Sequence, residues 1–210
     1  MNILSPELQR IRRALHPLDT APQAPCWNID DLSGLLSETD PVAVAAAVLV
    51  GLVPRSSGLQ VLLTRRNDAM RHHAGQVSFA GGRIEPDDLD ASAAAVRETT
   101  EETGIPASLI QPLGYLDPLA TVTGFRVQPV VAVVRPEYVA RPDAREVDDV
   151  FEVPFDFLMH PGNLHSLQLD LGGRPRSVLQ FVDRGEAGRR IWGASASILL
   201  NLRQRLETMR

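Results

Sequence analysis

The sequence predicts a mixed α/β (α+β) fold, with a mixed β-sheet sandwiched between helices. Two apolar, β-rich segments, residues 42–53 and 59–65, are joined by Pro-Arg-Ser-Ser-Gly, which is typical of a hairpin. A helix is clearly delimited between an N-cap at Asp90 and a stop at Gly104. Aromatic residues make up only 5% of a chain that is 44% hydrophobic, so small aliphatic side chains must build the core. A sheet covered by helices suits such a core.

The first 40 residues are predicted to form a short helix and a strap that pack on a domain spanning residues 41–210. Ser5 is a helix N-cap, Pro6 takes the first helical position, and Leu8, Ile11 and Leu15 lie on one face. Residues 16–40 contain three prolines and few periodic apolar positions, so we expect them to cross the surface of the domain.

The rest of the chain alternates between predicted strands and loops. A short strand at residues 76–79 leads to Gly81 and Gly82, where a tight turn or a close approach of the backbone is expected. Further strands are predicted at residues 127–134, 147–153, 164–171 and 178–182, and a helix at residues 194–209 closes the chain.

Composition excludes several classes of protein. The single cysteine, Cys26, cannot form an internal disulfide, and the first residues carry no leader pattern, so we expect a cytoplasmic protein. No apolar segment reaches the roughly 20 residues that cross a bilayer, which predicts no membrane partner. A net charge of −5 argues against a broad basic surface for nucleic acid. An anionic substrate would therefore need a metal ion and local arginines.

The predicted helix at residues 90–104 carries the chemistry. Side chains three and four residues apart share a helix face, so Glu98 lies beside Glu101 and Glu102. These like charges repel one another on a surface helix unless solvent or a hard cation compensates. Glu98 and Glu102, one turn apart, would supply a half-site for Mg²⁺ or Mn²⁺, and Arg97 is placed to pair with Glu101. A solvated helix face is the alternative interpretation.

Residues 82–105 resemble the Nudix box, G-x5-E-x7-R-E-U-x-E-E-x-G-U. The second half matches at Arg97, Glu98, Glu101, Glu102, Gly104 and Ile105. In the first half Asp88 takes the place of the Glu, eight residues separate it from Arg97, and Thr99 replaces a bulky aliphatic residue. The resemblance implies the Nudix fold and hydrolysis of a nucleotide pyrophosphate, with Glu98, Glu101 and Glu102 at the metal and Glu101, Glu98 and Arg97 as catalytic residues. Either Glu101 or Glu98 would act as the base.

A second signature precedes the box and resembles the coenzyme A pyrophosphatase branch of the family. It runs L-L-T-x-R-S/A-x3-R-x3-G-x3-F-P-G-G and matches at Leu62, Leu63, Thr64, Arg66, Arg71, Gly75, Phe79, Gly81 and Gly82, with Asn67 and Ala80 as departures. This resemblance implies cleavage of coenzyme A to 3′,5′-ADP and 4′-phosphopantetheine. Alternatives are another nucleoside diphosphate derivative such as ADP-ribose, or a catalytically silent module that binds a nucleotide.

Substrate binding is predicted for the segment between the second strand and the box. Arg66, Arg71 and His73 form a candidate phosphate clamp, since guanidinium groups bind phosphate through a planar fork. Gly81 and Gly82 would let backbone approach a phosphate, although a tight turn explains them equally well. The expected partner is a small nucleotide, bound by a monomer or a homodimer.

Overall fold

The computed structural model of the chain describes residues 4–30, 44–69, 74–170, 175–182 and 189–209. Within these residues the main sheet has eight strands, with β1 (Val44–Arg55) at its centre. β1 pairs antiparallel with β2 (Gly58–Arg66) and parallel with β7 (Phe125–Val134), so the sheet is mixed, as predicted. A shared run of buried Val, Leu and Ala along β1 and β7 forms the middle of the core.

The other strands extend this central trio. β3 (Val77–Ser78) and β8 (Val147–Pro154) pair with β2, and β4 (Gly81–Arg83) pairs with β1. β5 (Ile110–Tyr115) and β6 (Leu119–Ala120) pair with β7. A separate antiparallel sheet contains β9 (Leu164–Asp170), β10 (Pro175–Val182) and β11 (Arg190–Trp192).

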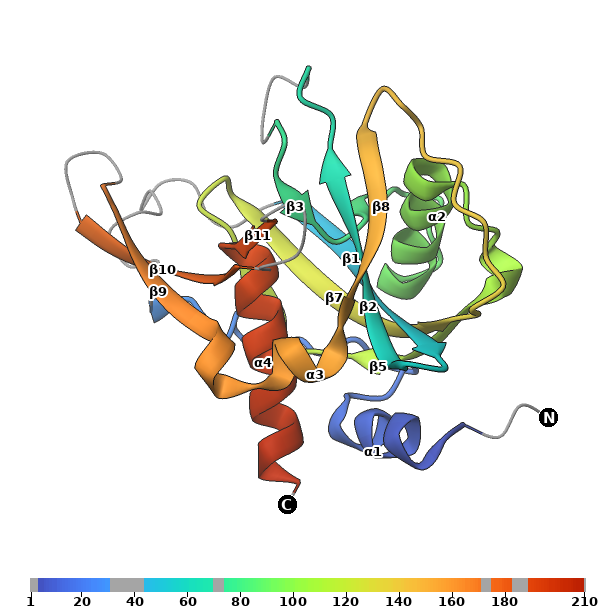
Figure 1. Cartoon of the computed structure of the whole chain (residues 1–210), viewed down its shortest axis with the longest axis horizontal. Helices are drawn as coiled ribbons and strands as arrows, with labels where there is room; N and C mark the ends of the chain where they lie inside the picture. The colour runs from blue at the N-terminus through green and yellow to red at the C-terminus, as the bar shows by residue number, and fades with distance from the viewer. Residues whose placement is uncertain (1–3, 31–43, 70–73, 171–174, 183–188, 210) are drawn as a thin grey trace.

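Helices cover both faces of the main sheet (Figure 1). α2 (Ala91–Thr103) packs on one face, in a cluster with Ala47, Leu49 and Val130. α1 (Pro6–Ala14), α3 (Phe155–Met159) and α4 (Ala194–Thr208) contribute to the cluster on the other face. Two short 3₁₀ turns, η2 (Ala107–Leu109) and η3 (Pro161–Asn163), lead into β5 and β9.

The segment that follows α1 lies against the main sheet. The backbone of His16 hydrogen bonds to the backbone of Tyr115 at the end of β5. The backbone N–H of Trp27 donates to the carbonyl of Pro118 at 3.0 Å. α1 itself packs beside α4. The second half of the predicted strap, residues 31–40, lies outside the described residues. No helix in the described part of the chain is long and apolar enough to cross a membrane.

The sequence predictions hold for the long elements and fail for several short ones. The hairpin, the capped helix α2 and the terminal helices are confirmed. β5 was not predicted, because Pro112 and Gly114 interrupt its apolar pattern; an added Cβ at Gly114 would lie 2.4 Å from the carbonyl oxygen of His16. Gly81 and Gly82 were expected at a tight turn or a close approach of the backbone; they form part of strand β4, where the close approach is confirmed.

Candidate active site

Helix α2 is held in place by its caps and by a face of small residues. The Asp90 side chain accepts a hydrogen bond from the Ala93 N–H at 2.8 Å, and Gly104 ends the helix in the left-handed conformation with φ 69°. Ala94 and Ala95 are fully buried, so the helix approaches the sheet closely. Thr99, which replaces an aliphatic residue of the box, is also buried, and its hydroxyl donates to the carbonyl of Ala95 at 2.7 Å.

The carboxylates of Glu98 and Glu102 meet the two glycines of β4. An added Cβ at Gly82 would lie 2.5 Å from the carboxyl group of Glu98, so only glycine leaves space for that side chain. The backbone of Gly81 hydrogen bonds to Glu102, and an added Cβ there would lie 2.3 Å from the carbonyl oxygen of Ala47. Close packing of β4 against β1 at Gly81 and against α2 at Gly82 therefore accounts for both glycines.

Glu102 is buried, which corrects the expectation that the acidic face lies at the helix surface. The residue is only 4% exposed. Burial raises the pKa of its carboxyl group to about 8, because the lowering effect of Arg66 is weaker and Glu98 and Glu146 add negative charge. Burial also raises the pKa of Glu98, against the lowering effect of its hydrogen bond with Arg97. The two carboxylates form a desolvated acidic pair that favours protons or cations.

Arg97 organises the rim of this pair. It donates to Glu98 at 3.0 Å and to Glu101 at 3.1 Å, which confirms the predicted contact with Glu101. It also forms two 2.9 Å hydrogen bonds with Asp88, whose side chain is 6% exposed. Arg97 therefore joins the loop before α2 to the helix. Asp88 takes the place of the first acidic residue of the box, and sequence analysis did not identify it as a site residue.

Glu101 differs from its two neighbours. Its side chain is 59% exposed and accepts from Arg97, whereas Glu98 and Glu102 lie against β4. Among the residues that the structure describes, no group of three or more His, Cys, Asp or Glu side chains is arranged to hold a metal ion. The three carboxylates on α2 therefore share a helix face without converging on one point.

Two residues from other elements reach the acidic pair. Arg66, at the end of β2, lowers the pKa of Glu102 through its positive charge, and its role in phosphate binding stays a prediction. Glu146, immediately before β8, is exposed and raises the pKa of both Glu98 and Glu102. Sequence analysis did not identify Glu146 as a site residue. Arg71 and His73, the other members of the predicted clamp, lie outside the described residues.

The donor set fits a hard divalent cation. Such ions prefer carboxylate oxygens and often take only one or two from the protein, with water and substrate phosphates as the remaining ligands. Glu98 and Glu102 provide two carboxylates at one place, and burial together with the charges of Glu98 and Glu146 raises the pKa of Glu102 against the opposing charge of Arg66. A cation bound there would supply the missing positive charge.

Comparisons with known proteins agree with this geometry. The family model of the NUDIX domain matches residues 45–169. The chain belongs to the Nudix family. The Escherichia coli (strain K12 / DH10B) protein described as the uncharacterized Nudix hydrolase NudL is 40% identical over 159 residues, covering 75% of this chain and 80% of that protein. Nudix hydrolases generally use divalent metal ions, so family membership and the carboxylate pair support the same chemistry.

A solved structure shows a similar fold over nearly the whole chain. The MutT/nudix family protein from Enterococcus faecalis aligns with a TM-score of 0.50 and 15% identity, covering 99% of this chain and 76% of that chain. At this identity the similarity concerns the fold alone. The mixed sheet with helices on both faces is therefore that of a Nudix hydrolase.

Proposed function

We propose that this Nudix hydrolase cleaves the pyrophosphate of coenzyme A or a coenzyme A derivative to 3′,5′-ADP and 4′-phosphopantetheine. The observation that carries the proposal is the signature ahead of the box, which matches the coenzyme A pyrophosphatase branch with unbroken spacing from Leu62 to Gly82. Its matched residues Leu62, Leu63, Thr64 and Arg66 lie on β2, and Gly81 and Gly82 lie on β4, beside the acidic pair. The branch assignment therefore concerns residues that border the site.

In this proposal Glu98 and Glu102 would hold Mg²⁺ or Mn²⁺. When bound, the cation neutralises charge on the pyrophosphate and makes its phosphorus more susceptible to attack. Arg97 fixes the carboxylates of Glu98 and Glu101 through its hydrogen bonds. Arg66 contacts a phosphate oxygen, and Arg71 and His73 complete the clamp from the segment between β2 and β3.

The reaction adds one water across a phosphoanhydride bond. A water oxygen forms a new bond to one phosphorus, the bridging P–O bond breaks, and the released phosphate leaves with the bridging oxygen. A base must take a proton from that water. Glu101 is the first candidate because its exposed carboxylate reaches solvent, and Glu98 is the alternative because burial raises its pKa and makes its carboxylate more basic. The enzyme is proposed to act in the cytoplasm as a monomer or a homodimer.

A substrate panel tests the proposal. Coenzyme A, dephospho-coenzyme A, ADP-ribose, a dinucleoside polyphosphate and a nucleoside triphosphate are each incubated with Mg²⁺ or Mn²⁺, and the products are resolved by chromatography. We expect the highest kcat/KM for coenzyme A or an acylated form, with 3′,5′-ADP among the products. A clear preference for ADP-ribose would remove coenzyme A while leaving the Nudix chemistry intact. Tight nucleotide binding without turnover would indicate a silent regulatory module.

A further inference from the structure

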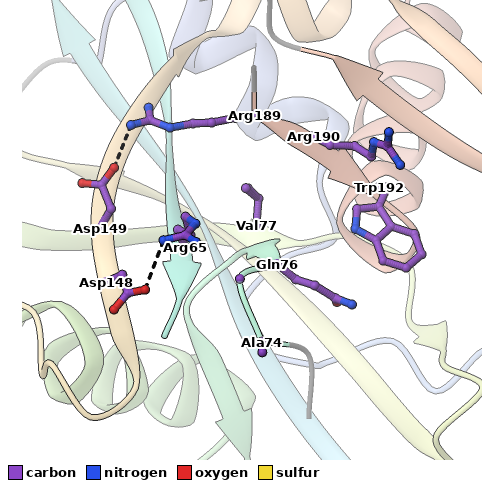
Figure 2. Close-up of a pocket in the computed structure, with 10 residues that line it drawn as sticks. Arg65, Ala74, Gln76, Val77, Asp148, Asp149, Arg189, Arg190 and Trp192 are labelled. Carbon is purple, nitrogen blue, oxygen red and sulfur yellow. Dashed lines mark hydrogen bonds and ion pairs between the residues drawn. The ribbon is translucent and has the colours of Figure 1, made fainter. Parts of the chain in front are cut away.

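A second feature lies around the edge of the sheet from the acidic pair. It is a pocket of about 600 Å³ between the ends of β2 and β3, the start of β8 and strand β11 (Figure 2). Arg65, Asp148, Asp149 and Arg189 line one side, and Arg190 and Trp192 line the opposite side. None of these residues belongs to the Nudix box or to the matched positions of the upstream signature.

Ion pairs occupy the charged groups on one wall of the pocket. The Arg65 guanidinium donates to Asp148 at 3.1 Å, and Arg189 donates to Asp149 at 2.7 Å. Arg189 is further fixed over the ring of Phe151, with its central carbon 3.7 Å from the ring centroid. Arg65 also pairs with Asp68 at 2.7 Å, so two guanidinium groups share three carboxylates and compensate most of their charge. This wall therefore repels an anion less than free carboxylates would.

The opposite wall offers a cation and an aromatic surface. Arg190 and Trp192 are two residues apart on β11 and therefore point to the same side of the strand. Arg190 is exposed, and within the described ranges no side chain forms a hydrogen bond or an ion pair with its guanidinium group. Trp192 is half-buried, which leaves part of its indole open to the pocket. A guanidinium beside an indole suits a phosphate attached to an aromatic base.

The pocket lies close to the acidic pair along three chain segments. Arg65 in the pocket is adjacent to Arg66, whose charge acts on Glu102; the Cα atoms of consecutive residues are about 3.8 Å apart. Asp148 follows Glu146 by two residues, and Val77 in the pocket precedes Gly81 by four. Arg65 and Arg66 are neighbours on β2 and point to opposite faces of the sheet, so the pocket and the acidic pair lie on the two sides of the end of β2. β3, between them, is an edge strand of only two residues.

We infer that this pocket binds the nucleotide arm of the pyrophosphate substrate, with the base stacked on Trp192 and a phosphate monoester on the ribose held by Arg190. The inference rests on the proposed function, because only a substrate with two arms joined by a pyrophosphate would occupy both places. An uncharged, flexible thiol arm would make no use of Arg190. The pocket would thus select for the ribose phosphate, while the acidic pair acts on the pyrophosphate.

Binding is tested first without turnover. The chain has two tryptophans, and Trp27→Phe leaves Trp192 as the sole indole fluorophore. In the described structure the buried Nε1 of Trp27 has no hydrogen-bond partner, so Phe loses no hydrogen bond there. Adenosine 3′,5′-bisphosphate should change the fluorescence of this variant saturably, and AMP, which lacks the 3′-phosphate, should bind about 10-fold or more weakly.

Two substitutions then locate the contacts. Arg190→Gln should remove the preference for the bisphosphate over AMP, while Arg12→Gln, at an exposed arginine on α1, should keep it. Trp192→Leu should raise KM for nucleotide substrates about 10-fold or more with little change in kcat. Circular dichroism and thermal melting check that the variants fold. If Trp192→Leu does not fold, the Arg190→Gln comparison still decides.

The outcomes separate this inference from the proposed function. Unchanged fluorescence, together with an unchanged KM in both variants of an enzyme that cleaves coenzyme A, would overturn the pocket assignment alone. The protein could instead prefer the bisphosphate through Arg190 and yet cleave no coenzyme A. That result would support the nucleotide pocket and overturn the proposed substrate. Equal binding of AMP and the bisphosphate in the parent protein would overturn the role of Arg190.

Discussion

Glu102 is buried and Asp117 is half-buried, and their surroundings have opposite effects on the pKa of the two carboxyl groups. Burial would raise the pKa of Asp117, but hydrogen bonds from His16, Asn201 and Arg205 outweigh it and hold the pKa below its usual range. These contacts measure 2.8 Å from His16, 2.9 Å from Asn201 and 3.0 Å from Arg205. At Glu102 burial prevails, and the pKa rises to about 8.

The contrast separates a carboxylate that stabilises the fold from one that is available for chemistry. The Asp117 cluster joins the chain after α1, the segment between β5 and β6, and α4, and its charges are balanced within the protein. The acidic pair has Arg66 nearby but also Glu98 and Glu146, so negative charge remains in excess. A buried charge without full compensation costs stability, and an external cation can reverse that cost. Such a site is expected where a ligand completes the structure.

The two carboxylates also have opposite effects on stability as pH changes. The pKa of Asp117 is lowered on folding, so its stabilising contribution is present above its usual pKa and is lost as pH falls. The pKa of Glu102 is raised from 4.5 to about 8. The stabilising contribution of Glu102 is therefore fully present below pH 4.5 and is lost as pH rises through 8, because ionisation of this buried carboxyl group is less favourable in the folded protein than in the unfolded chain.

The largest effect is expected for Glu102→Gln. We expect kcat to fall about 100-fold or more, about 2.7 kcal/mol at roughly 1.36 kcal/mol per decade, because the variant lacks a negative ligand for the metal. Stability in the absence of metal should not fall at pH 8, because a neutral amide replaces a buried carboxylate. Steady-state kinetics and urea unfolding measure the two effects. Near-normal turnover at saturating metal would remove Glu102 from the site.

Arg97→Ala is expected to affect both function and stability. It frees Glu98 and Glu101 and leaves the buried carboxylate of Asp88 without its ion-pair partner. Loss of a partner for a buried polar group costs about 1–3 kcal/mol, and we expect kcat to fall about 10-fold. Arg97→Lys, which keeps one positive charge, serves as the matched control. Unchanged kinetics with reduced stability would limit Arg97 to a structural role.

Asp117→Asn should show the complementary result. The change removes the charge at the centre of the cluster with His16 and Arg205, and we expect the free energy of unfolding at pH 7 to fall by about 1–3 kcal/mol. Turnover below the unfolding transition should remain within about two-fold of the parent enzyme, since the change affects neither the acidic pair nor its contacts. A 10-fold loss of kcat in a folded variant would contradict this separation of roles.

The same comparison explains what the sequence could predict. Helix α2 has local signals, a capping Asp90 and a terminating Gly104, and the Nudix motif fixes the order of its acidic residues. Burial of Glu102 depends instead on the approach of β4, which pairs with β1 some 35 positions earlier in the chain, as in the pairing of Gly82 with Ala47. The sequence pattern of the helix alone does not predict that β4 packs against it.

Long-range contacts account for the other differences. Asp88 lies nine residues before Arg97 and pairs with it only because the intervening loop returns to the helix. Glu146 reaches the acidic pair because β8 pairs with β2 in antiparallel register, which brings the start of β8 to Arg66. The cluster around Asp117 combines residues about 100 positions apart in sequence. Such contacts depend on sheet topology, which local periodicity does not encode.

The smallest expected effect concerns Glu146 and sharpens the electrostatic part of the comparison. Glu146 is exposed and raises the pKa of Glu102 only through its charge. Removing an exposed charge changes such an interaction by a few tenths of a kcal/mol. At about 1.36 kcal/mol per pKa unit, Glu146→Gln should shift the pKa of Glu102 downward by roughly 0.2–0.4.

The shift is measured from urea unfolding between pH 5 and 9 with a chelator present. The stability of the parent protein should fall as pH rises from 4.5 to 8, and in Glu146→Gln this loss should end at slightly lower pH. Glu102→Gln should lack the part of this fall in stability that comes from ionisation of Glu102. Glu7→Gln, at an exposed glutamate on α1, should leave that part unchanged. A 10-fold fall in kcat for Glu146→Gln would mean that Glu146 takes part directly in the reaction, because screened repulsion at this distance is too weak to change the barrier by 1.4 kcal/mol.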